Sequence, residues 1–384
     1  MHAESILPDA RAVDTLRHRE FPITDEWTYF DHATYGPHPR RYVETLTQVA
    51  HELAIHPLGT TSAGLDDVRA AAATLLHSPV EQVALLRSTG EGTNLVATGV
   101  QWAPGDEVIL YELDFPGLIA PWLALTDRGI RLRVVADRGR NRFDVDDVEQ
   151  LLSPRTRALS VSLVNNITGF RAPVEQLAEL CNARHIWLTV DAVQALGSID
   201  VDAPAFGADV VVSASYKFML SGFGQAIAYV SERALTELKV PHVGVRNLHL
   251  SPAGTLFETG LNLFETARKF EPSNPNLAAM FAMRASVELL LELGIERIES
   301  HNRKLCAQLV EGLQSKGYTL ITSQRESESA GLVCAVHNAI PAEQIQADLA
   351  AQHMLCAVRH GHLRFAPHVY NTPGEVEQIL RALP

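Results

Sequence analysis

The chain has 384 residues, of which 46% are hydrophobic, and a formal net charge of −13 at pH 7. This length and composition predict a globular protein with a large and a small domain. The negative charge argues against nucleic acid or an anionic membrane as a partner, and no apolar run is long enough to span a membrane.

The predicted elements divide the chain into three parts. Residues 1–28 are expected to form an arm with a short helix that packs on the small domain, and residues 253–384 a small α+β domain. Over residues 29–252, apolar strands alternate with helices, which predicts an α/β domain with a mostly parallel, seven-stranded sheet covered on both faces. The predicted strands are Val83–Arg87, Glu107–Tyr111, Ile130–Val135, Ala158–Val164, Ile186–Val190, Val210–Ser213 and Gln225–Val230.

Helices are predicted between these strands and at the start of the small domain. Those of the large domain include Arg40–Ile55, Gly92–Val100, Leu118–Arg128, Asp146–Leu152 and Val174–Arg184. The small domain is predicted to contain the helices Asn276–Leu293, Glu296–Lys316, Ala342–Gln352 and Glu375–Leu383, and the strands Tyr318–Thr322, Gly331–His337, Met354–Val358 and Leu363–Phe365.

The cysteines and histidines do not have the spacing of a metal site. Cys181, Cys306, Cys334 and Cys356 form no CxxC pair, so neither disulfides nor zinc is expected. Of the 16 histidines, only the two of His360–His362 are closely spaced, without a carboxylate beside them. The N-terminal segment lacks an apolar signal core, and we therefore expect a cytoplasmic protein without a metal.

Lys217 follows a buried strand directly and is itself followed by apolar residues. Burying an ammonium group without a partner is costly. A desolvated lysine has a lowered pKa and reacts well with carbonyl groups. A lone lysine at a strand end more often reaches water along its alkyl chain, so a chemical role for Lys217 depends on its partners.

Other polar or planar residues also follow strands, at the edge where a parallel sheet binds ligands. Asp191 ends a strand and would suit a protonated heterocyclic nitrogen, with Gln194 three residues further on, although a turn cap is equally consistent with Asp191. Asn166 adds an amide. Phe115 is placed either to cover an aromatic cofactor or to pack in the core.

The segment from Arg87 to Asn94 joins a strand to a helix and contains Ser88, Thr89 and Gly90. Small and hydroxyl residues at a helix N-terminus expose backbone N–H groups to an anion, although an ordinary capped helix fits these residues equally well. The segment is neither a Walker A loop nor GxGxxG.

Together these residues match the needs of pyridoxal 5′-phosphate. This cofactor requires a phosphate site, a partner for its ring nitrogen, a stacking side chain, a donor to its O3′ oxygen and a lysine that forms an imine. A dinucleotide cofactor would explain the anion site but neither Lys217 nor Asp191. A pyridoxal-phosphate protein that acts as a sensor would need a partner-binding module, and no DNA-binding module is appended.

The chain resembles the class V aminotransferase superfamily of fold-type I pyridoxal-phosphate enzymes, which includes cysteine desulfurases, kynureninases and isopenicillin-N-epimerase-like proteins. The resemblance extends from Tyr29 to the C-terminal helix. It rests on Asp191-Ala-Val-Gln194, on Ser215-Tyr216-Lys217 in the kynureninase form, and on the interval between Asp191 and Lys217.

The resemblance implies a role for each matching residue. Lys217 would form the imine and move protons, Asp191 would hold the pyridinium, Gln194 would approach O3′ and Phe115 would stack on the ring. Thr89, Gly90 and Tyr216 would bind the phosphate. The segment Phe270–Asn276 would place Asn274 at the phosphate of a partner subunit, which implies a homodimer.

The substrate would be a small amino acid. In the resemblance, Arg364 before Tyr370-Asn371-Thr372 holds its carboxylate, Asn166 lies near that carboxylate, and Arg359 is a second anion contact. Desulfurases carry a cysteine in a loop between these two arginines, and here Arg359-His-Gly-His362 runs straight into Leu363-Arg364.

We therefore expect a Cα-carbanion enzyme without a persulfide cysteine, epimerase-like or a β-elimination lyase. The alternatives are a class V aminotransferase and an enzyme similar to cysteine desulfurases or selenocysteine lyases.

Overall fold

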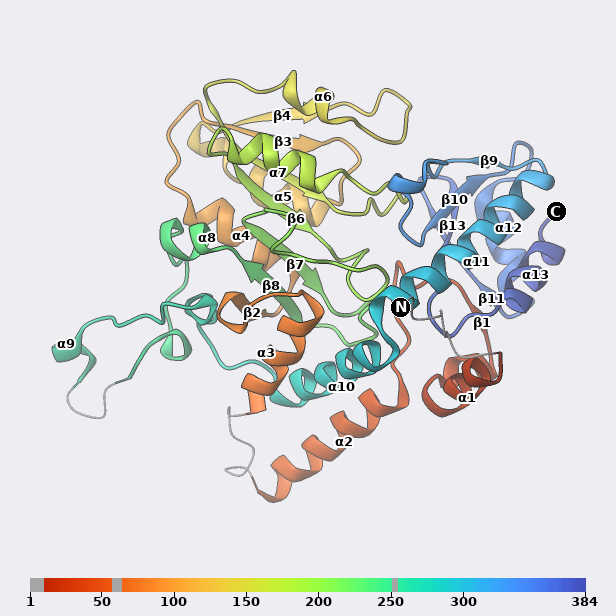
Figure 1. The fold of residues 1–384 in the computed structure, drawn as a ribbon, viewed down its shortest axis with the longest axis horizontal. Helices are drawn as coiled ribbons and strands as arrows, with labels where there is room; N and C mark the ends of the chain where they lie inside the picture. Colours follow the sequence, from red (N-terminus) through yellow and green to blue (C-terminus); the bar gives the residue numbers. More distant parts are fainter. Residues whose placement is uncertain (1–9, 57–63, 251–254) are drawn as a thin grey trace, which may run out of the picture.

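The computed structural model describes residues 10–56, 64–250 and 255–384 (Figure 1). Residues 1–9 of the expected N-terminal arm lie outside the described residues. The larger part of the molecule is built around one sheet, and a smaller C-terminal part lies beside it, as Figure 1 shows.

The large sheet has seven strands in the order β2-β8-β7-β6-β5-β3-β4. Strand β8 runs antiparallel to β2 and β7, and the pairs from β7 to β4 are parallel. The predicted α/β fold with a mostly parallel, seven-stranded sheet is therefore confirmed. The strands are β2 (Val83–Leu86), β3 (Glu107–Tyr111), β4 (Arg131–Val135), β5 (Thr156–Ser162), β6 (Trp187–Asp191), β7 (Val210–Ala214) and β8 (Ala226–Val230).

Alternate side chains of the central strands enter two separate hydrophobic cores. In β3, Ile109 and Tyr111 belong to one core, whereas Val108 and Leu110 belong to the other. Because successive side chains of a strand point to opposite faces, both faces of this sheet are buried. This explains why its strands are nearly continuous apolar runs in the sequence.

Helices cover both faces of the sheet. The first core also contains apolar residues of α3 (Gly64–Leu75), α6 (Val145–Glu149), α7 (Val174–Asn182) and α10 (Leu277–Leu293). The second core contains residues of α4 (Thr89–Gly99), α5 (Pro116–Leu123) and α8 (Glu232–Glu237). Helix α2 (Arg40–Ile55) packs on α10, and α10 packs on α3.

One predicted helix of this domain is wrong at its end. The expected helix Leu118–Arg128 ends at Leu123 and is followed by the 3-10 turn η3 (Thr126–Arg128). Pro121 lies inside α5 and has no N–H to donate, and Gly129 after the turn has a φ of +83°. Both residues favour an early end of the helix.

The C-terminal part has its own core and a four-stranded antiparallel sheet in the order β12-β13-β10-β9. Its helices are α11 (Ile295–Ser315), α12 (Ala342–Ala350) and α13 (Pro373–Ala382). Its strands are β9 (Thr319–Leu320), β10 (Val333–Val336), β11 (Met354–Leu355), β12 (Ala357–Arg359) and β13 (His362–Phe365).

The N-terminal segment runs along this C-terminal part. Helix α1 (Ala10–Glu20) carries Arg17, which forms an ion pair with Glu375 and donates to the Tyr370 carbonyl. After the turn η1 (Pro22–Asp25), β1 (Thr28–Tyr29) pairs in parallel with β11. The single strand expected over Met354–Val358 is therefore two strands, because β11 pairs with β1 and β12 pairs with β13.

The domain limits at residues 28 and 252 remain a proposal. Helix α10 follows residue 252 but packs on α2 and α3, and its Met280 and Met283 belong to the core of the large sheet. This packing favours a second limit at Gly294, between α10 and α11, where the backbone φ is +83°.

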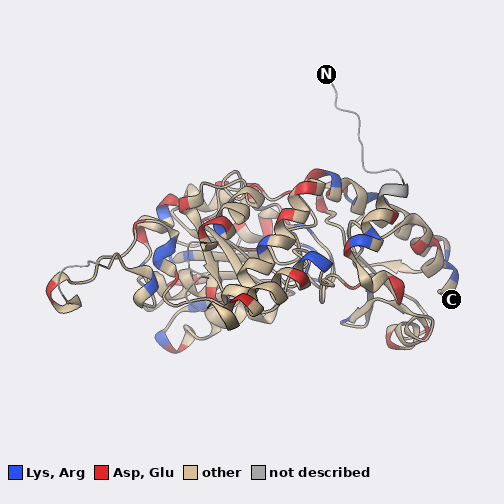
Figure 2. Cartoon of the chain, turned by 90° about the horizontal axis from the view of Figure 1, so that it is seen from below, with Lys and Arg blue, Asp and Glu red and all other residues tan. Residues whose placement is uncertain are grey.

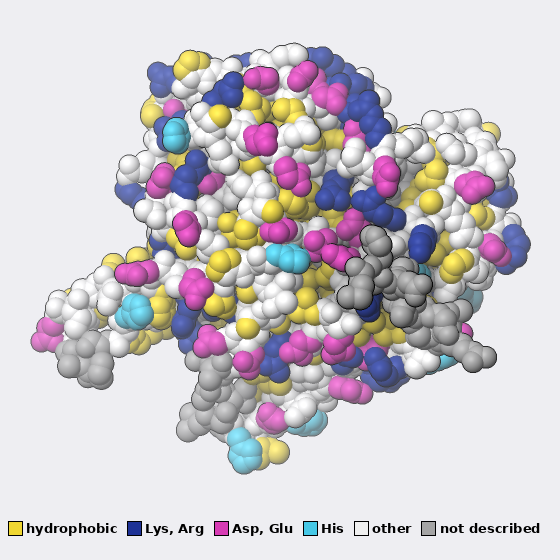
Figure 3. All heavy atoms as spheres, viewed as in Figure 1, with side chains coloured by type: hydrophobic (Ala, Val, Ile, Leu, Met, Phe, Trp, Pro, Cys, Tyr) yellow, Lys and Arg dark blue, Asp and Glu magenta, His cyan; other side chains and the backbone are white. Residues whose placement is uncertain are grey.

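The surface carries charges of both signs. Acidic and basic residues are interspersed along the chain in Figure 2, and their side chains are mixed on the face drawn in Figure 3. Within the part of the chain that the structure describes, no helix is both long and apolar enough to cross a bilayer. The segment around α9 (Leu256–Thr259) extends away from the rest of the molecule in Figures 1 and 2, and Phe257 on it is fully exposed.

Candidate active site

A cavity of about 230 Å³ lies at the edge of the large sheet where the parallel strands end. Asp191 is the last residue of β6, Ser162 the last of β5, and Lys217 follows β7. Because the carboxyl ends of parallel strands meet at one edge, residues distant in sequence line one space. The predicted residues among them are Thr89, Gly90, Phe115, Asn166, Asp191, Gln194, Tyr216 and Lys217.

Lys217 is the lysine that lines this cavity, and 8% of its surface is exposed. Burial lowers the pKa of Lys217 to about 8, Asp191 opposes this shift, and Arg364 and Arg359 add to it. Its Nζ lies 5.7 Å from the ring centroids of both Phe115 and Tyr216. A lysine with this pKa is partly neutral near physiological pH and can act as a nucleophile or a base.

The backbone around Lys217 is closely held by other segments. Gly36 N–H donates to the Tyr216 carbonyl, and a Cβ on Gly36 would lie 2.0 Å from the Lys217 carbonyl oxygen. Gly197 has a φ of +97°, and a Cβ there would lie 2.4 Å from the Phe218 carbonyl oxygen. Only glycine fits at these two positions. The lysine segment is therefore fixed from two sides.

Asp191 is buried, and its Oδ1 accepts from the Val193 backbone N–H at 2.8 Å. Burial raises the pKa of this carboxyl group to about 6, although the Val193 N–H and Lys217 act in the opposite direction. A positive charge brought into the cavity would favour the ionised carboxylate. A protonated ring nitrogen would be such a charge.

One end of the cavity is formed by the N-terminus of α4. The Ser88 side chain caps the helix by accepting from the Glu91 N–H at 3.2 Å, and Thr89 and Gly90 form the first turn, where backbone N–H groups lack intrahelical partners. Gly92 allows this helix to pack closely on the sheet, because a Cβ there would lie 2.4 Å from Val212.

The polar atoms of the cavity fit pyridoxal 5′-phosphate. Gln194 donates from Nε2 to the Ala33 carbonyl at 3.0 Å, while its Oε1 is buried without a hydrogen-bond partner among the described residues. Asn166 Oδ1 is likewise buried and unpaired within the described chain. Buried polar atoms without partners are rare in folded proteins and indicate a missing ligand or water. The unpaired amide oxygens, the carboxylate and the amine thus suit the cofactor.

The three remaining predicted residues do not line this cavity. Arg364 is 1% exposed and lies next to it, where its Nη1 donates to the Asn166 carbonyl at 2.7 Å. Arg359 donates to Thr34 Oγ1 at 2.9 Å. Asn274 is exposed on the surface, and its role toward a partner subunit remains a prediction.

The hairpin between the two arginines has no space for an inserted loop. Arg359 of β12 pairs with His362 of β13, so that His360 and Gly361 alone form the turn. Both have positive φ, +50° and +74°, as a type I′ turn requires. All four cysteines are buried and none lines the cavity. Burial raises the pKa of the Cys356 thiol to about 12.

Several residues of this region were not identified from the sequence. Val193 and Phe223 line the cavity, and Phe223 stacks on Tyr216 with a centroid distance of 4.6 Å. Asp114 is buried, and its carboxylate accepts from the Ser162 backbone N–H. Burial raises the pKa of Asp114 to about 7. The position of Asp114 shortly after β3 was the available signal. Thr34 had none, since its partners lie more than 300 residues away.

The fold and the cavity define a pyridoxal-phosphate enzyme of fold type I. The family model for aminotransferase class-V matches residues 29–382, and the chain belongs to this family. It is 25% identical over 396 residues to a protein of Methanothermobacter thermautotrophicus named "Probable cysteine desulfurase", covering 94% of this chain and 95% of that protein. The protein described here is therefore a pyridoxal-phosphate-dependent enzyme.

Solved structures share the fold at low sequence identity. The apo cysteine desulfurase of Thermococcus onnurineus aligns with a TM-score of 0.86 at 21% identity, covering 99% of this chain and 98% of that chain. The cystine C-S lyase C-DES, in complex with its product cysteine persulfide, also aligns with a TM-score of 0.86 at 21% identity, covering 94% of this chain and 98% of that one. A mutant of C-DES carries glycine covalently linked to its pyridoxal-phosphate cofactor.

Proposed function

We propose that this enzyme cleaves the carbon–sulfur bond of a cysteine-like amino acid by β-elimination. The names of its relatives favour the alternative reading of the sequence, an enzyme similar to cysteine desulfurases, over an epimerase or a lyase without a persulfide cysteine. The observation that carries the elimination is that the buried cysteines leave the cavity without a thiol. The sulfur would then leave for solvent and not for a cysteine of this chain.

The residues of the cavity have distinct parts in this proposal. When bound, pyridoxal 5′-phosphate supplies an electron sink for the negative charge that develops on the substrate Cα. Asp191 would stabilise the protonated ring nitrogen, and the α4 N-terminus with Tyr216 would bind the phosphate. Phe115 and Val193 present apolar surface that excludes water from the ring.

Lys217 and Arg364 act on the amino acid. Arg364 binds the substrate carboxylate, for which its unpaired Nε is a donor. Lys217 Nζ takes the proton from Cα, and the Cβ–S bond then breaks with its electron pair staying on sulfur as a thiolate. A base with a pKa of about 8 suits this proton transfer near neutral pH.

A product analysis with L-cysteine tests the proposal. Elimination followed by hydrolysis of the released enamine by water yields sulfide, pyruvate and ammonia, and we expect these from the wild type. Lys217→Ala should lower the rate by roughly 100- to 10,000-fold, the usual contribution of a positioned acid or base. Alanine together with protein-bound sulfur would instead indicate a desulfurase that uses a cysteine of this chain. Formation of D-cysteine or of a keto acid that retains its sulfur would favour epimerisation or transamination.

We also propose that the enzyme is a homodimer in which Asn274 reaches the cofactor of the partner subunit. Asn274 is exposed, and the projecting α9 segment carries exposed apolar residues, Phe257 and Leu261. Such residues suit burial against a second copy. Sedimentation analysis should give the mass of two chains, and Phe257→Glu should shift it toward one.

A further inference from the structure

The Thr34 hydroxyl lies between two arginine side chains. Its Oγ1 is 2.7 Å from Nη2 of Arg364 and 2.9 Å from Nη2 of Arg359. Because a guanidinium group only donates hydrogen bonds, Thr34 accepts both. The Asp31 carboxylate, three residues before Thr34, forms an ion pair with Arg364 at 3.5 Å. The hydroxyl group is therefore an acceptor that the two guanidinium groups share.

This threonine is held in place by the segment that surrounds it. Thr34 N–H donates to the Asp31 carbonyl at 2.9 Å, and the preceding Ala33 carbonyl accepts from Gln194 Nε2 at 3.0 Å. Two residues further on, Gly36 contacts the backbone of Lys217. The turn that carries Thr34 is thus anchored to two residues of the cofactor cavity.

The arginine pair still has a free donor. Arg364 Nη1 donates to the Asn166 carbonyl, whereas its Nε is buried without a partner within the described chain. Asp31 is partly buried and is shared by the two guanidinium groups. Two positive charges near one carboxylate leave a surplus of positive charge that an anion would neutralise.

We propose that Thr34 is a positioning residue, whose hydroxyl holds Arg364 and Arg359 together as one binding unit for the carboxylate of the substrate. The proposal rests on the assignment of Arg364 to that carboxylate under the proposed function. Without the hydroxyl, both guanidinium groups lose an acceptor, and Arg364 is held only by Asp31 and the Asn166 carbonyl. Substrate binding then weakens while the chemistry at Lys217 remains.

Two substitutions separate the hydroxyl from the shape of the side chain. Thr34→Val keeps the volume and removes the hydroxyl, and Thr34→Ser keeps the hydroxyl. We expect KM for L-cysteine to rise about tenfold in Thr34→Val, the effect of one hydrogen bond to a charged group, with kcat within twofold of wild type. Thr34→Ser should restore KM to within about threefold. Thr24→Val, which removes a hydroxyl bonded to the Phe21 carbonyl in the N-terminal segment, is the matched control.

A second readout does not depend on the reaction that the enzyme catalyses. L-alanine carries the carboxylate but no leaving group, and its binding to the holoenzyme is followed by the change in cofactor absorbance. Its half-saturating concentration should rise about tenfold in Thr34→Val and not in Thr24→Val. If L-cysteine gives no sulfide but this shift is observed, the proposed function fails and the role of Thr34 stands.

The link through Arg359 provides the decisive comparison. Arg359→Met should weaken L-alanine binding in the wild type and weaken it less in Thr34→Val, because the part of its effect that acts through Thr34 is already lost. Unchanged L-alanine binding in Thr34→Val, or fully additive effects of the two substitutions, would overturn the proposal. A fall in kcat and in melting temperature that Thr34→Ser does not reverse would show a structural role only.

Discussion

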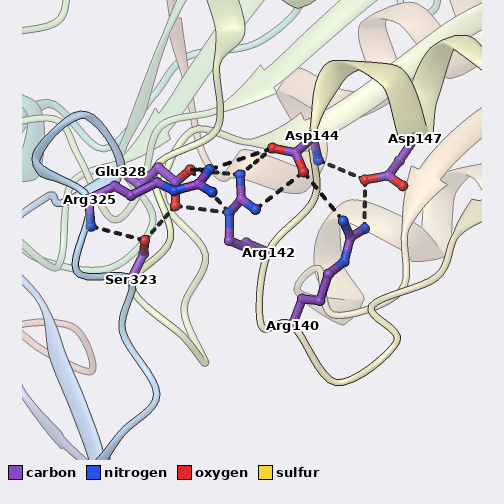
Figure 4. A network of polar contacts seen from close by, with 7 residues as sticks. All are labelled: Arg140, Arg142, Asp144, Asp147, Ser323, Arg325 and Glu328. Carbon is purple, nitrogen blue, oxygen red and sulfur yellow. Dashed lines mark hydrogen bonds and ion pairs between the residues drawn. The ribbon is translucent and has the colours of Figure 1, made fainter.

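Two groups of arginines join the C-terminal part of the molecule to the rest, and they differ in burial and in charge balance. The first group is the unit of Arg364, Arg359, Thr34 and Asp31 beside the cavity. The second, drawn in Figure 4, joins the loop before α6 to the turn η6 (Glu326–Glu328). Its members are Arg140, Arg142, Asp144, Asp147, Ser323, Arg325 and Glu328.

The network in Figure 4 is balanced, with three arginines and three carboxylates. Arg142 pairs with Glu328 at 2.8 Å, Arg140 with Asp147 at 2.6 Å, and Arg325 with Glu328 at 3.1 Å. The Arg325 side chain is 63% exposed and that of Asp144 is 46% exposed, whereas those of Arg142 and Glu328 are 15% and 11% exposed. The exposed pairs of Arg325 contribute little stability, because water and salt screen them.

The unit beside the cavity is neither balanced nor exposed. Arg364 is 1% exposed, its Nε has no partner among the described residues, and Asp31 pairs with Arg364 and lies near Arg359 as well. Fully paired charges at the surface hold segments together, whereas an unsatisfied buried donor next to a cavity indicates a place for a ligand. The second group therefore joins segments of the fold, whereas the first group is placed to bind a ligand.

The largest effect is expected when the buried group loses its arginine. Arg364→Ala leaves Asp31 without its ion pair and opens a cavity, and should lower the free energy of unfolding by about 3–5 kcal/mol. Urea denaturation of the holoenzyme measures this loss. A loss below about 1 kcal/mol would show that the buried unit is no more costly to break than a surface pair. The two groups of arginines would then not differ in their contribution to stability.

A second test concerns the effect of the same burial on Lys217. Because its folded pKa is about 8 and its usual value is 10.5, the unfolded chain binds more protons between these pH values, and the stability of the cofactor-free protein rises with pH across this window. Lys217→Met should therefore stabilise the cofactor-free protein at pH 7 by about 3 kcal/mol. This advantage should disappear by about pH 10.5.

Thermal denaturation of both proteins from pH 7 to 10.5 measures this difference. Lys304→Met, at an exposed position, is the control and should show no such pH dependence. An advantage of Lys217→Met that is constant with pH would mean that packing and not charge is responsible.

The smallest effect is expected in the network of Figure 4. Arg325→Ala should lower the free energy of unfolding by about 0–1 kcal/mol at low salt and by less at 1 M salt, because the exposed Arg325 charge is screened there. Melting temperatures at both salt concentrations test this. A loss of several kcal/mol that salt does not reduce would place this network with the buried unit.

The sequence by itself determined the alternation of strands and helices and the residue types at the strand ends. Lys217, Asp191 and Phe115 could be singled out because a period of two residues, or an apolar run, marks a strand and the next polar residue marks its end. The parallel arrangement then predicts one common edge. The closely spaced Arg359 and Arg364 also excluded an inserted loop between them.

Only the tertiary structure decided how distant segments meet. The bond from Thr34 to Arg364 spans 330 residues, and nothing near Thr34 in the sequence indicates its partner. The division of Met354–Val358 into two strands depends on β1, which comes from the other end of the chain. The pKa of Lys217 likewise depends on burial by many segments. Local patterns record which face of an element is apolar, whereas contacts and desolvation arise only when these faces are packed together.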